Sequence, residues 1–156
     1  MKNATLIGAS GFVGTAILKE ALLRGHKVTV VAPNPEKITI KDKNLTVVKG
    51  DATNPDVLAE VAKGKDAVIS AYNPGWTNPR QYEETLENYP KIVEGTKKAG
   101  VRRLLIVGGA GTLFVEPGVR LVDTGTLPDT WLPGVKSMGE FYLNYLMKED
   151  GVDWIF

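Results

Sequence analysis

The sequence contains no cysteine and one histidine, His26, among its 156 residues. The absence of cysteine excludes disulfides, thiolate catalysis and cysteine metal ligands, and it is consistent with a reducing, cytoplasmic location. One histidine cannot supply a histidine pair for a metal ion, so we predict no metal site. His26 directly follows Gly25, which is predicted to end a helix, and we interpret it as a helix-end or surface residue.

Neither sign of charge dominates, and long hydrophobic runs are absent. With 19 basic and 18 acidic residues the formal net charge is +1, which argues against a nucleic-acid or membrane-surface partner. No segment approaches the roughly 20 apolar residues of a membrane span. The length and the 43% hydrophobic content suit one compact core. We therefore expect a soluble, single-domain protein over residues 1–156.

A glycine-rich turn interrupts the apolar segment Thr5-Leu6-Ile7-Gly8-Ala9-Ser10-Gly11-Phe12-Val13-Gly14. The pattern predicts a strand, a tight turn and a helix. Gly8 suits the turn, Gly11 would let a diphosphate approach the main chain, and Gly14 would let the helix press against the strand. The helix N-terminus favours the same anion. These positions favour a dinucleotide site over an ordinary strand-to-helix turn. The residues expected on the buried face of the helix are Val13, Ile17 and Ala21.

Strand and helix patterns alternate along the rest of the chain, which is typical of an α/β fold. Further strands are predicted at Lys27–Ala32, Leu45–Lys49, Ala67–Ala71, Leu104–Val107 and Val152–Phe156, and helices at Pro55–Lys63, Gln81–Ala99 and Pro133–Glu149. We expect a doubly wound, Rossmann-type parallel sheet of order 3-2-1-4-5-6 with helices on both faces. That order places the glycine turn and Ser70–Tyr72 across one crevice.

Three features fall outside this regular pattern. Pro90 lies inside the third helix and predicts a kink or a break near Tyr89. The stretch Leu113–Leu132 is a long connection, which is usually functional or mobile. The last helix carries apolar residues that form either core or a dimer face, and core is the simpler interpretation. These residues are Met138, Phe141, Tyr142, Tyr145 and Leu146.

Residues at the strand ends are candidate nucleotide ligands. The segment Ala32–Pro35 offers neither an acid for the ribose of NAD nor an arginine for the phosphate of NADP, so NAD and NADP stay open. Lys37 is either a phosphate ligand or, as we favour, a solvated loop residue. Asp51 could accept a hydrogen bond from adenine or act only as a turn former. Tyr72 and Trp76 offer flat faces to a ring, although Trp76 could equally anchor its loop.

With these motifs the chain resembles the atypical short-chain dehydrogenase/reductases over essentially its whole length, in particular the bacterial NAD-dependent epimerase/dehydratase and NADH-flavin reductase group. The resemblance rests on the segments Ile7–Gly14, Ala67–Trp76, Val107–Leu113 and Pro133–Lys136. It implies an NAD or NADP site whose diphosphate lies over Gly8, Ser10, Gly11, Phe12 and Val13. It also implies adenine near Asp51 and Ala52, and nicotinamide near Ser70, Ala71 and the Gly108-Gly109-Ala110 turn.

The resemblance further implies a tyrosine proton donor four residues before a lysine. Lys136 matches the lysine, but the tyrosine position holds Leu132, which cannot donate a proton. Thr112 is the only hydroxyl near the end of the fifth strand. Relatives without the tyrosine imply direct hydride transfer between stacked rings, with solvent supplying the proton. Lys136, as a ribose ligand, and Tyr72 are the candidate catalytic residues.

The resemblance also leads us to expect some tens of residues after the sixth strand, so the chain reads as a truncated, minimal or designed version. Three functions stay open. They are an NAD(P)H-dependent reductase acting on a small molecule, a non-catalytic dinucleotide sensor, and a scaffold that binds no cofactor. Monomer and dimer are both open as well.

Overall fold

The computed structural model describes residues 2–156, and the contacts of the chain group them into two compact units. The first unit comprises residues 2–72, 91–107 and 150–156, and the second comprises residues 73–90 and 108–149. Among residues 2–156, no helix combines the length and the apolar character needed to cross a membrane. The expectation of a single domain stays a prediction.

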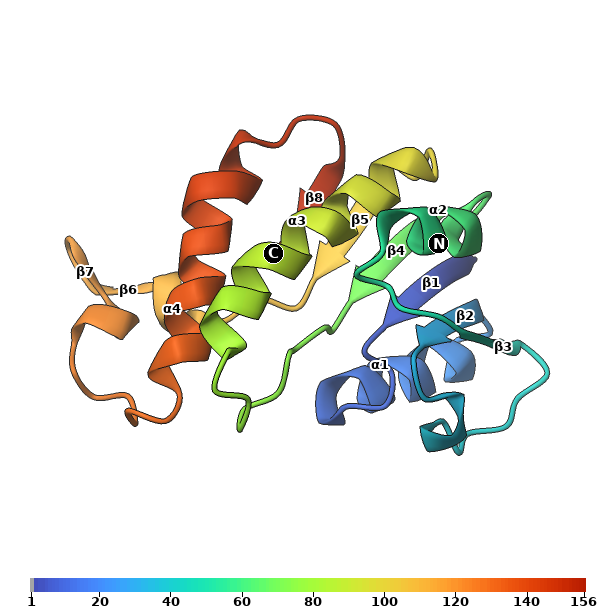
Figure 1. Ribbon diagram of the computed structural model, residues 1–156, viewed down its shortest axis with the longest axis horizontal. Helices are drawn as coiled ribbons and strands as arrows, with labels where there is room; N and C mark the ends of the chain where they lie inside the picture. Colours follow the sequence, from blue (N-terminus) through green and yellow to red (C-terminus); the bar gives the residue numbers. More distant parts are fainter. Residues whose placement is uncertain (1) are drawn as a thin grey trace. The chain divides into compact units, whose positions relative to one another are not determined.

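A six-stranded sheet of order β3-β2-β1-β4-β5-β8 forms the first unit (Figure 1). Every pair of neighbouring strands is parallel. The strands are β1(Asn3–Ile7), β2(Lys27–Ala32), β3(Leu45–Lys49), β4(Ala67–Ser70), β5(Arg103–Ile106) and β8(Asp153–Ile155). The predicted strand order is confirmed, with β8 as the sixth strand. The central strands β1, β2 and β4 are almost entirely buried because helices cover both faces of such a sheet, whereas the edge strands β3 and β8 are not.

Helix α1(Phe12–Leu23) packs on the sheet face that carries Leu6 and Val30. Its buried residues are Gly14, Leu18, Ala21 and Leu22. The predicted buried face was therefore wrong in part, since Val13 is 42% exposed and Ile17 is only partly buried. The reason is the close approach of the helix at Gly14, which turns that side of the helix toward the strands.

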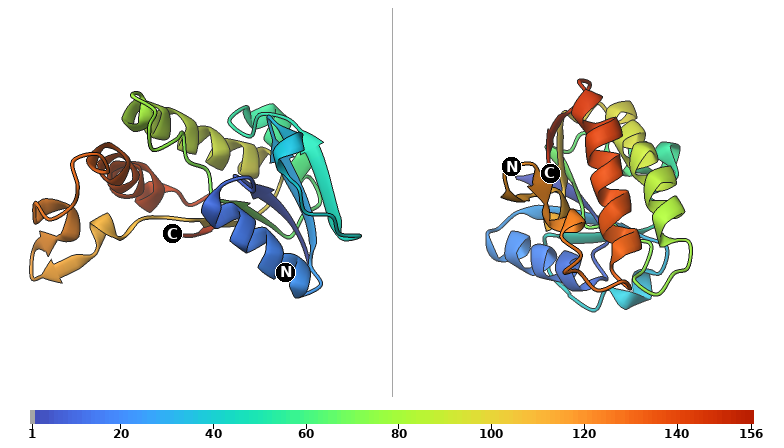
Figure 2. Two further views of the ribbon diagram at one scale, coloured as in Figure 1. Left: turned by 90° about the horizontal axis from the view of Figure 1, so that it is seen from below. Right: turned by 90° about the vertical axis from the view of Figure 1, so that its left-hand side faces the viewer.

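Helix α2(Pro55–Ala62) covers the opposite face, where Val57 and Val31 both come close to Gly50 (Figure 2). The Asn54 side chain caps this helix by accepting hydrogen bonds from the N–H groups of Asp56 and Val57. The cap, followed by Pro55 at the first helical position, is the N-terminal signal that the sequence predicts.

Helix α3(Gln81–Lys98) runs unbroken through Pro90, so the alternative of a break near Tyr89 is wrong. An internal proline costs a helix about 3 kcal/mol. Tyr89 on one side of the proline is 1% exposed, and Ile92 and Val93 on the other side are fully buried. Burial of these side chains offsets the missing backbone hydrogen bond and keeps both parts of the helix in register.

The second unit contains structure that the sequence did not reveal. The stretch predicted as a long connection holds a hairpin of β6(Phe114–Glu116) and β7(Val119–Arg120). Gly118, with φ of +79°, makes its tight turn. Short 3-10 turns flank the hairpin at η2(Ala110–Thr112) and η3(Leu121–Asp123).

The last predicted helix is present as α4(Leu132–Glu140), continued by a π-helical turn η4(Phe141–Tyr145) and a 3-10 turn η5(Leu146–Lys148). Phe141 and Leu146 are buried, while the other three residues of the expected apolar face are half-buried. The Phe141 ring lies 4.9 Å from that of Tyr89 and 5.6 Å from that of Tyr145, measured between centroids. The core interpretation is confirmed for Phe141 and Leu146, and a dimer face stays a prediction.

Candidate functional site

The turn between β1 and α1 is built on glycines that no other residue could replace without backbone movement. Gly8 has φ of +79°, and a Cβ there would lie 2.6 Å from the carbonyl carbon of Ala71. The N–H of Ala71 donates to the carbonyl of Ile7 at 3.0 Å. The turn after β1 and the end of β4 are therefore in direct backbone contact, while a crevice between them stays a prediction.

Gly14 and Gly11 differ in what surrounds them. A Cβ on Gly14 would lie 2.6 Å from the carbonyl carbon of Gly8, so the first turn of α1 presses on the glycine turn. A Cβ on Gly11 would meet only the Gly8 carbonyl oxygen, at 3.4 Å. Glycine at position 14 therefore allows α1 to pack closely against the turn, whereas the space beside Gly11 is open.

The N-terminus of α1 carries no side chain that would occupy its N–H groups. Gly11 is the N-cap residue, makes no side-chain cap, and no acidic residue stands in the first turn. Ser10 is exposed, and Phe12 is 96% exposed. Free N–H groups and the positive end of the helix dipole together attract anions.

Thr15 is a further part of this turn that the sequence analysis did not single out. Its Oγ1 donates to the carbonyl of Ala9 at 2.9 Å, and its N–H donates to the carbonyl of Gly11 at the same distance. These bonds tie the turn to the first turn of α1. A hydroxyl one residue after the last glycine of the pattern is the signal that could have identified it.

Asp51 and Ala52 follow β3 in the same unit. One Asp51 carboxylate oxygen accepts hydrogen bonds from the N–H of Thr53 at 2.9 Å and from its hydroxyl at 2.7 Å. Asp51 therefore forms the turn through this oxygen. Its second carboxylate oxygen is not used in the turn, so a hydrogen bond to adenine stays a prediction. Ala52 is buried, at 6% exposure, so its side chain serves packing.

Ser70, Ala71 and Tyr72 follow one another at the end of β4. Ser70 is fully buried, and its Oγ accepts a hydrogen bond from the N–H of Tyr72 at 3.3 Å. Its carbonyl accepts one from Val107 at 2.8 Å. Ser70 therefore fixes the backbone at the end of β4 through these two hydrogen bonds, while Ala71 and Tyr72 are half-exposed.

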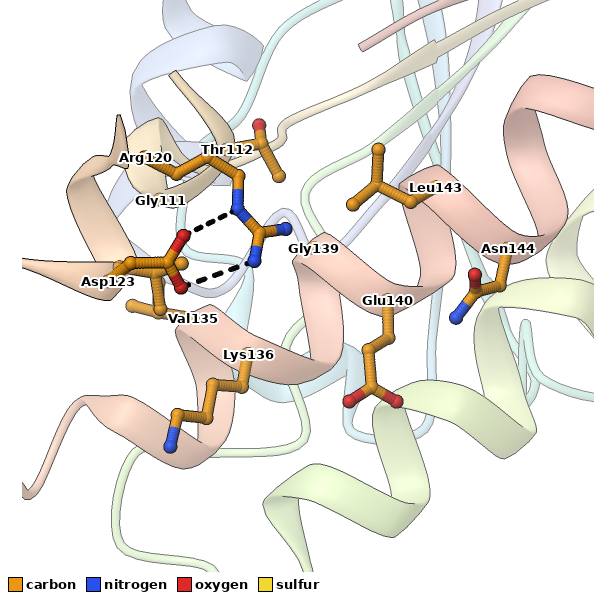
Figure 3. Close-up of a pocket in the computed structure, with 11 residues that line it drawn as sticks. Gly111, Thr112, Arg120, Asp123, Val135, Lys136, Gly139, Glu140, Leu143 and Asn144 are labelled. Atoms are coloured by element: carbon orange, nitrogen blue, oxygen red, sulfur yellow. Dashed lines mark hydrogen bonds and ion pairs between the residues drawn. The ribbon is translucent and has the colours of Figure 1, made fainter. Parts of the chain in front are cut away.

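The remaining predicted residues belong to the second unit. Gly108 and Gly109 are exposed, and a Cβ on Gly109 would meet nothing within 4 Å. Lys136 lies on α4 and lines a cavity of about 320 Å³ (Figure 3). The other residues around this cavity are Gly111, Thr112, Arg120, Val122, Asp123, Val135, Gly139, Glu140, Leu143 and Asn144.

An ion pair that the sequence analysis missed forms one wall of this cavity. Arg120 donates from Nε to one Asp123 oxygen at 2.8 Å and from a terminal nitrogen to the other at 3.2 Å (Figure 3). The guanidinium lowers the pKa of Asp123, and the carboxylate raises the pKa of Arg120. Both residues lie in the stretch that the sequence showed only as a long connection.

Lys136 and Glu140 stand one helical turn apart on α4, on the same side of the helix (Figure 3). The Glu140 carboxylate accepts a hydrogen bond from Tyr82, which raises the pKa of the Tyr82 hydroxyl. Tyr82 comes from α3, so no local sequence motif links it to Lys136. Within residues 2–156, no cluster of three or more histidine, cysteine or acidic residues could hold a metal ion.

A family model described as NAD(P)H-binding matches residues 8–155. The chain belongs to this NAD(P)H-binding family. NAD or NADP is accordingly its cofactor, and the glycine turn fits that assignment because a Cβ at Gly8 or Gly14 would overlap main-chain atoms.

Several proteins and solved structures that are similar to this chain are longer than it is. The Bacillus subtilis protein YwnB is 37% identical over 153 residues, which cover 97% of this chain and 68% of YwnB. A structure from Bacteroides thetaiotaomicron, provisionally assigned as an epimerase, is 56% identical with a TM-score of 0.92. The match covers 99% of this chain and 69% of that one.

A third similar protein is SP1627 from Streptococcus pneumoniae, provisionally assigned as an NADH-flavin reductase. Its structure is 28% identical with a TM-score of 0.73, covering 99% of this chain and 70% of that one. The chain also spans only 36% of a plant relative, cinnamoyl-CoA reductase 1 from Arabidopsis thaliana. The expected membership of an NAD(P)-binding reductase and epimerase group is confirmed, and the chain covers about two thirds of YwnB and of the two solved structures but about one third of the plant reductase.

Proposed function

We propose that this chain is the cofactor-binding part of an NAD(P)H-dependent reductase that passes hydride directly to a small, planar, conjugated acceptor such as a flavin. The observation that carries the proposal is the glycine turn, closed to side chains at Gly8 and Gly14 and open beside Gly11. The similarity to SP1627 supports the choice of acceptor class.

The diphosphate would be held by the main chain of Gly8, Ser10, Gly11, Phe12, Val13 and Gly14. The unpaired N–H groups in the first turn of α1 and the helix dipole supply the charge complement. The family resemblance assigns adenine to Asp51 and Ala52, and nicotinamide to Ser70, Ala71, Gly108 and Gly109. It assigns Lys136 to the ribose hydroxyls, and within residues 2–156 the Lys136 ammonium forms no ion pair or hydrogen bond that would compete with this role.

Direct transfer is favoured because the proton-donating hydroxyl is missing. Leu132 stands four residues before Lys136, and the buried Ser137 hydroxyl donates to the carbonyl of Gly134 at 3.1 Å. When bound, the reduced nicotinamide supplies a hydride, and the acceptor takes its proton from water. The protein then acts by holding and orienting two rings.

The partner we propose is a small molecule, since a net charge of +1 gives no electrostatic attraction to nucleic acid or to a membrane surface. The absence of cysteine favours a reducing compartment such as the cytoplasm. A dinucleotide sensor is the second candidate, and Leu132 in place of a proton donor is what favours it. The two differ in turnover, because a sensor binds the cofactor without oxidising it.

Calorimetric titration with NADPH and NADH tests the proposal, with Gly11→Ala as the decisive variant. This substitution fills the open space beside the turn, so binding should weaken about tenfold or more, while folding is unaffected. Ala16→Ser, on the exposed part of α1, is the matched control and should bind normally. Binding with turnover of riboflavin supports the reductase, and binding without turnover of any planar acceptor supports the sensor. No binding by a cooperatively folded chain overturns both.

A further inference from the structure

Trp76 and Trp131 form an exposed aromatic pair in the second unit. Their ring centroids are 6.4 Å apart, and their planes are inclined by 54°. Trp76 is 58% exposed and Trp131 is 51% exposed. Two of the three tryptophans of the chain therefore lie at this one place. Large aromatic side chains normally bury most of their area. Two half-exposed indoles next to each other therefore indicate a binding surface.

The loop that carries Trp76 is held by its own hydrogen bonds. The N–H of Gly75 donates to the Asn73 side chain at 2.7 Å, and the N–H of Asn78 donates to the carbonyl of Gly75 at 3.1 Å. The Asn78 amide also donates to Glu84 on α3 at 2.9 Å. Trp76 therefore projects from a loop whose backbone is fixed on both sides of it.

Trp131 is held just as firmly, at the N-cap of α4. Its N–H donates to the carbonyl of Pro128 at 2.9 Å, and its carbonyl accepts from Val135 at 3.0 Å. One turn further on, Gly134 is buried against Gln81, and a Cβ on Gly134 would lie 2.7 Å from the Gln81 amide nitrogen. Through this contact the first turn of α4 packs against the first turn of α3. The positions of the two indoles are therefore fixed in the absence of a ligand.

We infer that Trp76 and Trp131 bind the planar conjugated ring of the acceptor, in the isoalloxazine class, by stacking on one indole and contacting the edge of the other. Both indoles are more than half exposed, and their planes are inclined by 54°, so the pair offers a ring two aromatic surfaces at an angle to one another. Flat aromatic rings prefer such offset stacked and edge-to-face contacts. The inference rests on the proposed reductase function, which it deepens by naming the surface that takes the acceptor.

Quenching of tryptophan fluorescence by riboflavin, a neutral isoalloxazine, measures this binding in the whole chain. We expect Trp76→Ala and Trp131→Ala each to raise the dissociation constant roughly tenfold, the value typical of one lost aromatic stacking partner. Phe114→Ala, which removes another exposed aromatic residue of the same unit, is the control and should leave the constant unchanged. Trp154→Phe should retain the quenching, because Trp154 belongs to β8 in the first unit.

The NADPH dissociation constant, measured by calorimetry on the same variants, separates this inference from the proposed function. It should stay within twofold of wild type in Trp76→Ala and Trp131→Ala. If riboflavin binds with an unchanged constant in both variants, or quenching disappears in Trp154→Phe, the assignment of this surface is overturned. If riboflavin binding depends on both tryptophans but the chain binds no NADPH, the aromatic surface stands and the reductase function fails.

Discussion

Gly14 lies so close to the carbonyl group of Gly8 that a Cβ on Gly14 would come within 2.6 Å of the carbonyl carbon. The glycine turn therefore packs against the helix that follows it. This packing fixes the backbone conformation of the turn in the absence of a cofactor.

Gly14→Ala should destabilise the protein by roughly 1–3 kcal/mol, because the methyl group overpacks against main-chain atoms that cannot move aside cheaply. Gly11→Ala should change stability by less than about 0.5 kcal/mol, since its Cβ meets a single atom at contact distance. Urea denaturation of both variants checks the difference. Equal stability of the two variants would show that the turn relaxes more readily than the structure indicates.

Asn54→Ala should cost about 1 kcal/mol, since the side chain caps α2 through the N–H groups of Asp56 and Val57. Asn34 also precedes a helical turn, η1(Pro35–Lys37), but makes no side-chain cap. Asn34→Ala is therefore the matched control and should be nearly neutral. The free energy of unfolding, measured in urea for both variants, tests the cap, and an equal loss in both would contradict it.

Asp123→Asn should lower stability at neutral pH and remove part of its dependence on acid pH. Arg120 lowers the pKa of the Asp123 carboxyl in the folded protein. The stabilisation is therefore present above the unfolded pKa of about 3.9 and disappears as the pH falls through the lower folded value. Thermal melts between acid and neutral pH measure it. Asp129→Asn, at an exposed position, serves as control, and parallel pH curves for the two variants would argue against the ion pair.

Glu140→Gln should lower the pKa of Tyr82 toward the ordinary tyrosine value of about 10, because the variant lacks the charge that the hydroxyl now faces. The phenolate absorbance of the protein, minus that of Tyr82→Phe, isolates this group among the five tyrosines. Glu60→Gln, on the exposed part of α2, should leave the titration unchanged. An unchanged titration in Glu140→Gln would mean that the carboxylate does not hold the hydroxyl.

The sheet could be predicted from the sequence because each of its strands is a short apolar run set off by turn residues. The bounds of β2 and β3 and the stops at Gly25 and Gly64, both with positive φ, follow from local chemistry. Gly8 and Gly14 could be assigned for the same reason, since the spacing of the glycines carries the geometry of the turn.

What could not be predicted depends on contacts between distant segments. Trp131 is adjacent to Trp76, and Tyr82 to Glu140, only because α3 and α4 start side by side through Gln81 and Gly134. The same holds for the helix through Pro90, where burial outweighs the local preference for a break. Local propensity carries no information on such tertiary effects.

The two indoles at 6.4 Å also have an optical consequence. Chromophores this close and inclined to one another couple their electronic transitions and give a split circular-dichroism band that isolated indoles lack. The band belongs to the second unit, whereas Trp154 in β8 belongs to the sheet. The split band therefore reports the folding of the second unit, and its loss along a melting curve can be compared with the unfolding of the whole chain to test how cooperatively the units unfold.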